Sequence, residues 1–323
     1  MNNYTWLQQK LHKFALSSQL IREVTFDLES SIYSSNENND EHVFVMGLAR
    51  SGTTVLLNAL YESHEFASLT YEDMPFILAP NIWNKINFKK KDINFFKRAH
   101  GDGLKVSLES PEAFEESFWM TFDQTEKDTL KKFKNYVNLI SHKYNKYRYL
   151  SKNNQNIKRV ELISKTFPNA KILIPFRHPL QHAYSLFVQH KKFINFSKED
   201  KFISNYMKWI GHSEFGPNYI PIQNKRLFFK NDLNINHWIE QWYLTYKSIL
   251  SLVIKKNNIN LVCYERLCNK KNYWLDILNL INISKTYDFV FTESKKEIHE
   301  EIENENYNKA LSLYSELSDY KLS

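Results

Sequence analysis

Residues 42–63 read HVFVMGLARSGTTVLLNALYES, and this stretch decides the fold. A short apolar run, 43–46, ends at Gly47, and a polar loop, 48–54, follows it. The apolar residues within 55–60 then fit a helix that packs on its parent sheet. A strand, a tight loop and a helix start turn backbone N–H groups toward a phosphate, and the helix dipole adds positive potential. The stretch therefore predicts a phosphate-binding loop.

The loop departs at one position from the loop of nucleoside-triphosphate-binding proteins. Their pattern, G-x-x-x-x-G-K-[ST], places Lys directly after the second Gly. Gly47 and Gly52 have that spacing, but Thr53 takes the position of the lysine, and Arg50 supplies a cation from inside the loop. Gly52 permits close approach of the backbone to an anion, and Thr53 and Thr54 carry hydroxyl donors. A P-loop kinase or NTPase stays a rival, as does a plain glycine-bearing turn before a core helix.

A second informative stretch links another predicted strand to a helix. Residues 171–176 form an apolar strand, Arg177 follows it, and Pro179 suits the first position of the next helix. Arg177 at the strand end and Ser185 in that helix can converge on one phosphate, through a bidentate contact and a hydroxyl donor. A third apolar strand, at 259–263, directly precedes Tyr264.

Together these motifs resemble those of sulfotransferases, whose donor is 3′-phosphoadenosine 5′-phosphosulfate (PAPS). The family writes R-S-G-T-T between strand and helix, as residues 50–54 do, and a strand-end Arg with a Ser eight positions on, as at Arg177 and Ser185. FPNAKIL before that Arg and YERL at 264–267 also match the family. The form with Arg in the loop is most similar to the tyrosylprotein, carbohydrate and bacterial members.

The resemblance implies a role for each matching residue. Glu72, about twenty residues beyond the loop Arg, takes the position of the catalytic base, and Asp73 is the alternative. Lys152, twenty-five residues before Arg177, takes the position of the lysine that reaches the reacting sulfate, which Arg50 would also neutralise. No metal is needed, and adenosine 3′,5′-bisphosphate is the expected product. The implied donor-binding residues are Arg50, Ser51, Gly52, Thr53, Thr54, Arg177, Ser185 and Tyr264.

Two positions depart from the family pattern. Gln189 stands four residues past Ser185, where tyrosylprotein-type enzymes often carry another Arg. Residues 294–296, Ser-Lys-Lys, stand in place of a C-terminal R-K-G string that closes over the 3′-phosphate. The sequence therefore does not predict the additional phosphate contacts that the family makes.

Charge, cysteine count and hydropathy limit the kinds of partner and the compartment expected for this chain. The chain has 323 residues, 43 Lys and Arg against 36 Asp and Glu, and a formal charge of +7, which is too small and dispersed to indicate nucleic acid. The only cysteines, Cys263 and Cys268, exclude a disulfide framework and suit a reducing compartment. The sequence has no apolar run of the length that spans a bilayer and no apolar block of a signal peptide, so a cytoplasmic protein without stable membrane insertion is expected.

The three strands, separated by helices, predict an α/β fold with a P-loop-like central parallel sheet flanked by helices, a single domain with helical additions. A polar break divides an N-terminal helical extension, 1–41, from a sulfotransferase domain, 42–323. We also expect a charged helix over 126–150. Another helix is expected to start at Ser110 and Pro111, and its acids Glu112, Glu115 and Glu116 are expected to be exposed.

The expected reaction is in-line transfer of a sulfuryl group to an acceptor hydroxyl, with Glu72 removing its proton. Basic and aromatic residues between Trp83 and His100 fit a glycan site or a solvated loop, and a carbohydrate is the expected acceptor. Tyrosine, lipid and small-alcohol acceptors stay open. The alternatives are a P-loop kinase or NTPase, and an inert binder of sulfated or phosphorylated polymers.

Overall fold

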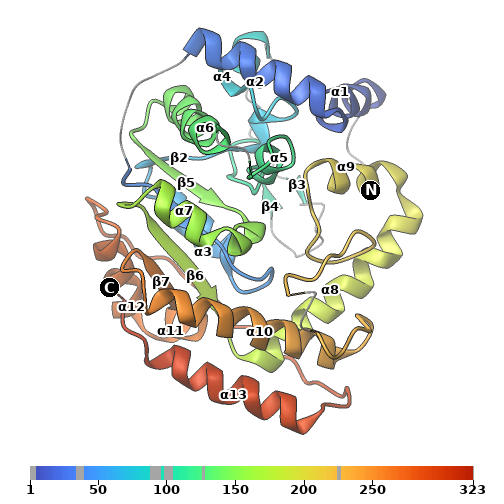
Figure 1. Ribbon diagram of the computed structural model, residues 1–323, viewed down its shortest axis with the longest axis vertical. Coiled ribbons are helices and arrows are strands. Elements are labelled where there is room, and N and C mark those ends of the chain that lie inside the picture. The colour runs from blue at the N-terminus through green and yellow to red at the C-terminus, as the bar shows by residue number, and fades with distance from the viewer. Residues whose placement is uncertain are drawn as a thin grey trace.

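The computed structural model describes residues 5–33, 40–87, 96–97, 105–125, 128–223 and 227–322. Its centre is a five-stranded sheet in the order β2-β5-β1-β6-β7 (Figure 1). Every neighbouring pair in this sheet is parallel, so all carboxyl ends of the strands lie at one edge. The strands are β1 (Val43–Val45), β2 (Phe66–Ala67), β5 (Arg148–Lys152), β6 (Lys171–Phe176) and β7 (Ile259–Cys263). The predicted parallel α/β sheet is confirmed.

Helices cover both faces of the sheet because the buried strands present apolar side chains in both directions. Val43 and Val45 belong to the apolar cluster that includes the side chains of α3 and α12. Phe44, between them, belongs to the other cluster, which α6, α7, α8, α10 and α13 build. These helices are α3 (Thr53–Tyr61), α6 (Thr129–Tyr144), α7 (Val160–Thr166), α8 (Pro179–Glu199), α10 (Ile235–Val253), α12 (Lys271–Leu280) and α13 (Asn304–Asp319).

The N-terminal segment forms two helices, α1 (Trp6–Ser17) and α2 (Gln19–Tyr33), at the top of Figure 1. Thr5 starts α1 with a capping box that Gln8 completes. The helices pack on α6, on α4 (Pro80–Ile86) and on α9 (Lys201–Trp209). The remaining elements include α5 (Glu116–Trp119), α11 (Tyr264–Asn269), the short antiparallel pair β3 (Phe96–Lys97) and β4 (Lys105–Val106), and the 3₁₀ turns η1 (Tyr71–Asp73) and η2 (Asn154–Lys158).

Two helix predictions are wrong. The charged segment 126–150 is not one helix, because α6 ends at Tyr144 and the chain enters strand β5 at Arg148. The helix expected from Ser110 does not start there either. Pro111 instead forms an antiparallel bridge with Thr70, and α5 begins only at Glu116. In both places tertiary pairing overrides the local helix signal.

Within the described part of the chain, no helix combines the length and apolar character needed to cross a bilayer.

Candidate functional site

The loop between β1 and α3 turns through two residues with positive φ. Arg50 has φ 70° and Gly52 has φ 104°, the left-handed region that favours glycine. A Cβ atom on Gly52 would overlap the ring of Tyr264, which packs directly on the loop. The N–H of Ser51 donates to the oxygen of Leu48 at 3.2 Å, so the loop closes on itself before α3 begins. The structure thus has the strand, tight loop and helix start that the sequence predicts.

The first loop and the second motif meet directly. The Nε of Arg50 donates to the Oγ of Ser185 at 3.2 Å. Ser185 lies in the second turn of α8, which begins directly after β6, and β6 pairs with β1. The strand ends that carry Arg50 and Arg177 are therefore neighbours at one edge of the sheet. In open parallel sheets this edge is where ligands bind.

Tyr264 and Arg177 extend this arrangement toward the C-terminal segment. The guanidinium of Arg177 lies 5.8 Å from the centroid of the Tyr264 ring, and its Nη2 donates to the oxygen of Ser294 at 3.2 Å. The hydroxyl of Tyr264 donates to the oxygen of Thr292 at 3.1 Å. Burial raises the pKa of Tyr264 to about 12, so the phenol stays a neutral donor.

The segment 292–296 is held against the start of α8 by paired hydrogen bonds. The amide of Gln181 donates to the oxygen of Lys296 and accepts from its N–H, each at 2.9 Å. Residues 294–296, which replace the basic string of the family, thus lie beside Arg177. Sequence reasoning did not identify Gln181, and its position one turn after Arg177 is the signal that could have found it.

Behind the loops, two side chains position the backbone. Glu265 accepts from the N–H of His178 at 2.8 Å, and its other oxygen accepts from the hydroxyl of Tyr314 at 3.2 Å. His182 donates from Nε2 to the oxygen of Ala49 at 2.7 Å. Burial lowers the pKa of His182 to about 3, so this ring is neutral and has one N–H to donate. Neither histidine was predicted from the sequence as part of the site.

Lys152 lies at the carboxyl end of β5, in register with Val45 of β1. Its side chain is buried, at 7 % exposed. Two residues later, the Oδ1 of Asn154 accepts from the hydroxyl of Thr53 at 3.1 Å. Asn154 was not predicted, because a lone amide in the run Lys-Asn-Asn carries no motif.

Glu72 and Asp73 have different surroundings. The carboxylate of Asp73 is buried and accepts from the N–H of Thr70 and the hydroxyl of Tyr144, each at 2.7 Å, and it pairs with Lys143. Glu72 is half-buried in η1, and its backbone is anchored by the oxygen of Leu108 and by the indole of Trp83. Asp73 therefore caps η1. Glu72 carries the other carboxylate of this turn, which follows β2 in the chain.

The prediction of exposed acids after Ser110 is wrong. Glu115 is only 2 % exposed, and it accepts from Ser151 at 2.5 Å and from Tyr149 at 3.1 Å, both on β5. Glu116 forms a bidentate pair with Arg159, at 2.7 and 2.8 Å. These carboxylates join the 110–119 segment to β5 and to the residues after it, so they hold the strand that carries Lys152.

A pocket opens beside the first residues of the phosphate loop. Apolar and aromatic side chains from α8, α10 and the segment 214–222 form most of its wall, and three polar side chains interrupt them. Its lining residues are Gly47, Leu48, Ala49, Asn154, Leu186, Glu214, Tyr219, Ile220, Ile222, Trp238 and Gln241. The pocket is small, and its lining combines apolar side chains with hydrogen-bonding ones.

Two further predictions concern the surroundings of the site. Among the residues that the structure describes, no three His, Cys, Asp or Glu side chains come together as a possible metal site. The basic and aromatic segment between Trp83 and His100 lies outside the described residues at 88–95 and 98–100.

Comparisons with known proteins place these features in a family context. A family model described as the sulfotransferase family matches residues 42–214, which is more than half of the chain. A search of curated proteins finds no match.

Three solved structures are among those similar to this chain. A sulfotransferase from Mycobacterium avium is 13 % identical, with a TM-score of 0.45, over 98 % of this chain and 79 % of its own. One from Mycobacterium tuberculosis is 12 % identical, with a TM-score of 0.49, over 99 % and 82 %. One from Alicyclobacillus acidocaldarius is 15 % identical, with a TM-score of 0.39, over 85 % and 92 %.

Proposed function

We propose that this chain, which belongs to the sulfotransferase family, transfers a sulfuryl group from PAPS to an acceptor hydroxyl group. The observation that carries the proposal is the hydrogen bond between Arg50 and Ser185. It joins the phosphate loop after β1 to Ser185 of α8, the helix that follows β6, and β1 and β6 are adjacent. A donor with phosphate groups at both its 3′ and 5′ positions needs two anion sites at the same end of the sheet.

The two anion sites divide the donor between them. The backbone N–H groups of the loop, with the hydroxyls of Ser51, Thr53 and Thr54, bind the 5′-phosphosulfate. Arg177 and Ser185 bind the 3′-phosphate, since an arginine at a strand end can make a bidentate contact. The ring of Tyr264, packed between Gly52 and Arg177, lies beside the nucleotide.

The chemistry needs a base and positive charge near the sulfur. The acceptor oxygen forms its bond to sulfur while the bond from sulfur to the bridging phosphate oxygen breaks, and adenosine 3′,5′-bisphosphate leaves with that electron pair. Glu72 takes the proton of the acceptor hydroxyl. Arg50 and Lys152 stabilise the charge that grows on the sulfuryl and bridging oxygens. The buried position of Lys152 beside β1 supports this role, because a cation acts more strongly away from water.

The engagement of Asp73 supports Glu72 as the base. Asp73 already holds three partners, and a carboxylate in that position is poorly placed to accept a further proton from a substrate. Glu72 makes its contacts in the described part of the chain through its backbone.

We propose a carbohydrate as the acceptor, bound in the pocket beside the phosphate loop. The half-buried side chains of Tyr219 and Glu214 give that pocket an aromatic ring and a hydrogen-bonding group. The pocket begins at Leu48 and Ala49, directly before Arg50, so an acceptor there would approach the donor from the sulfuryl end.

The experiment is transfer of labelled sulfate from PAPS to a panel of oligosaccharides, tyrosine peptides, lipids and small alcohols. The wild-type chain is expected to label an oligosaccharide. Glu72→Gln should lower the rate by about 100-fold or more, as loss of a general base does, while its affinity for adenosine 3′,5′-bisphosphate stays unchanged. Transfer that is undiminished in Glu72→Gln would remove Glu72 from the mechanism. No transfer to any member of the panel, together with tight binding of ATP, would favour the kinase alternative.

A further inference from the structure

Helix α2 buries two charged side chains, Arg22 and Glu29, and carries a row of aliphatic side chains outside. Leu20, Val24, Leu28 and Ile32 are four residues apart, so they form one stripe along the helix, and all four are exposed. The buried face carries Arg22, whose Nε donates to Thr121 at 2.7 Å. Phe26 anchors the same buried face in the core, so α2 carries apolar side chains on two faces, whereas an ordinary surface helix carries them on one.

The buried acid of α2, Glu29, is also held by hydrogen bonds, as Arg22 is. Glu29 is fully buried, and its Oε1 accepts from the N–H and the Nδ2 of Asn81, each at 2.7 Å. The N–H of Ile82 donates to the other carboxylate oxygen at 2.9 Å. These contacts fix the rotation of α2 about its axis, so the aliphatic stripe cannot turn inward.

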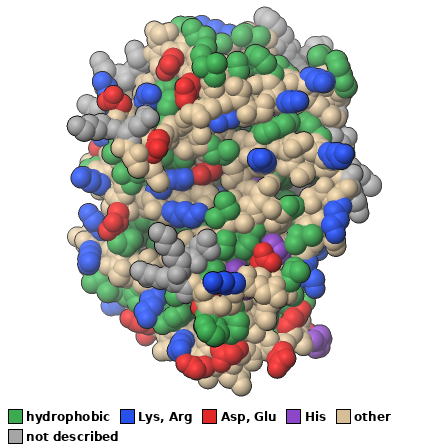
Figure 2. Space-filling model, turned by 45° about the vertical axis from the view of Figure 1, so that its right-hand side comes forward, with side chains coloured by type: hydrophobic (Ala, Val, Ile, Leu, Met, Phe, Trp, Pro, Cys, Tyr) green, Lys and Arg blue, Asp and Glu red, His purple; other side chains and the backbone are tan. Residues whose placement is uncertain are grey.

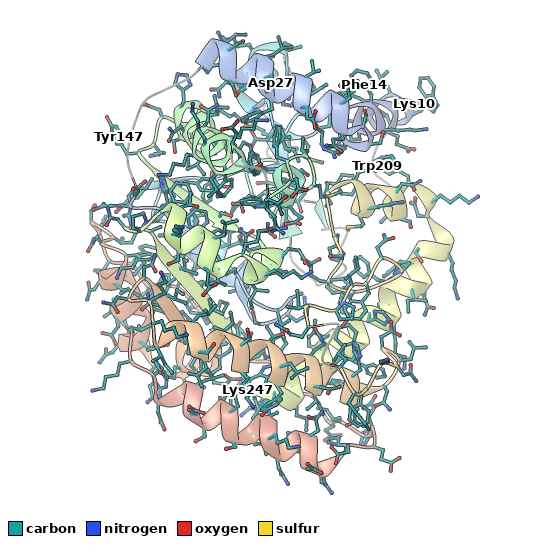
Figure 3. All side chains as sticks on the ribbon, in the orientation of Figure 1. Lys10, Phe14, Asp27, Tyr147, Trp209 and Lys247 are labelled. Atoms are coloured by element: carbon teal, nitrogen blue, oxygen red, sulfur yellow. The ribbon has the colours of Figure 1, made fainter. Side chains whose placement is uncertain are left out.

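Helix α1, which packs against α2, adds further exposed apolar side chains. The seven large apolar side chains of the two helices that are 46–72 % exposed are Trp6, Leu7, Phe14, Leu20, Val24, Leu28 and Ile32. We refer to this surface as the α1–α2 face. Figure 2 shows apolar side chains gathered at the top of the molecule, and Figure 3 shows Phe14 and Asp27 at this end. An apolar surface of this extent on a folded protein marks an interaction site.

The exposed charges of the α1–α2 face are segregated by helix. Helix α1 carries Lys10 and Lys13 and has no acidic residue. Helix α2 carries Glu23 and Asp27, and its only basic residue, Arg22, is buried. One helix therefore presents two positive charges and its neighbour two negative charges. A surface with this pattern is complementary to itself when a two-fold axis lays each α1 against the α2 of a second copy.

We propose that the α1–α2 face is the interface of a homodimer with two-fold symmetry. The aliphatic stripe and the aromatic residues of α1 form its apolar centre, and the basic and acidic helices pair across the axis at its rim. A membrane surface is the competing occupant. The charges of Lys10, Lys13, Asp27 and the half-buried Glu23 sum to zero, and Lys85, over the ring of Tyr33, adds one positive charge beside them. Helices that lie on anionic lipid carry a strongly basic polar face, which these do not.

The experiment measures mass by sedimentation equilibrium over a range of concentrations. The wild-type chain should reach twice its chain mass of 38.7 kDa. Leu20→Gln with Leu28→Gln should weaken the dimer by roughly 10- to 100-fold, because the apolar centre is lost. The matched control is Phe228→Gln with Val290→Gln, which changes two side chains that are 83 % and 85 % exposed outside the α1–α2 face, and it should leave the dimer unchanged. All four positions are exposed, so the fold tolerates the changes.

A charge exchange tests the two-fold geometry itself. Lys10→Glu with Lys13→Glu makes both helices acidic and should weaken the dimer. Glu23→Lys with Asp27→Lys makes both helices basic and should weaken it similarly. The chain with all four substitutions restores opposite signs and should regain the wild-type affinity.

Three outcomes would overturn the proposal. They are a wild-type chain that stays monomeric at every concentration, a dimer that the Leu20 and Leu28 substitutions leave intact, and failure of the fourfold exchange to restore association. A monomer that co-sediments with phosphatidylserine vesicles, and loses this with the two leucine substitutions, would assign the face to a membrane instead.

Discussion

Arg50 and Gly52 show how two backbone angles shape the donor loop. Both residues have positive φ, and the side chain of Arg50 is then directed to Ser185 in the neighbouring motif. A non-glycine residue is strained in this region, so the surrounding contacts must hold a left-handed arginine two residues before a left-handed glycine. The ring of Tyr264 over Gly52 is one of these contacts.

Gly52→Ala is expected to lower the free energy of unfolding by about 1–3 kcal/mol, from backbone strain and from overlap with the Tyr264 ring. It should also weaken binding of adenosine 3′,5′-bisphosphate. Denaturant unfolding and calorimetry measure the two effects. In a Tyr264→Leu background the penalty of Gly52→Ala should be smaller, because part of the overlap is gone. An equal penalty in both backgrounds would contradict the packing described here.

Asp73→Asn is expected to behave differently from Glu72→Gln. Asp73 pairs with Lys143, whose side chain is 5 % exposed, so removal of the carboxylate leaves a buried ammonium group without its counter-charge. We expect a loss of about 3–5 kcal/mol in the free energy of unfolding for Asp73→Asn. For Glu72→Gln, whose side chain is half-buried, the change should stay within about 0.5 kcal/mol. Equal stabilities of the two variants in denaturant unfolding would contradict the structural role of Asp73.

At the scale of elements, apolar runs identified β1, β6 and β7, but β5 escaped prediction. Its sequence, RYLSK, has one purely aliphatic residue, and its inward polar atoms are satisfied by a distant carboxylate. Tyr149 and Ser151 bond Glu115, which is more than thirty residues earlier. Local periodicity cannot detect a strand whose burial depends on such a partner. The same partner explains why the acids after Ser110 are buried rather than exposed.

The fold class predicted from the sequence is confirmed, and the roles assigned to the site residues stay predictions. Arg50, Arg177, Ser185 and Tyr264 come together because their motifs end adjacent strands, which spacing and strand order make readable. The supporting residues were missed, since a neutral histidine such as His182 acts through one backbone hydrogen bond. Such a contact exists only once the fold brings two segments together.

The elements around β1 are expected to weaken in acid because two buried histidines must stay neutral. Burial lowers the pKa of His42 to about 4 and that of His182 to about 3. The unfolded chain takes up these protons near pH 6.5, so their contribution is complete above that pH and is lost as the pH falls toward 4. Within this window each histidine should lower the free energy of unfolding by about 1.4 kcal/mol for every unit that the pH falls.

Urea unfolding at pH 7, 6 and 5 measures this dependence. His42 accepts the N–H of Tyr149 on its Nδ1 at 3.0 Å, a bond that the oxygen of an asparagine can also accept. His42→Asn should therefore remove the contribution of one histidine to the slope of the free energy of unfolding against pH. A slope equal to that of the wild-type chain would show that His42 does not titrate as its burial requires.

At the scale of the whole molecule, the parallel sheet explains why distant segments make one site. The strand order puts the end of β1 between the ends of β5 and β6, so Lys152, Arg50 and Arg177 follow three adjacent strands. The C-terminal segment returns over the start of α8 and touches Arg177 through Ser294. The residues of this site are far apart in the sequence, and the order of the strands in the sheet brings them together.

The most direct measurement compares the affinities of adenosine 3′,5′-bisphosphate and adenosine 5′-monophosphate by titration calorimetry. The two ligands differ only in the 3′-phosphate. The wild-type chain should bind the bisphosphate at least about tenfold more tightly, since one charge-assisted contact is worth about 1.5–3 kcal/mol. Arg177→Ala should abolish this preference, whereas Arg50→Ala should weaken both ligands and keep it. An equal affinity of the wild-type chain for the two ligands, or an undiminished preference in Arg177→Ala, would contradict the assignment of two anion sites to one donor.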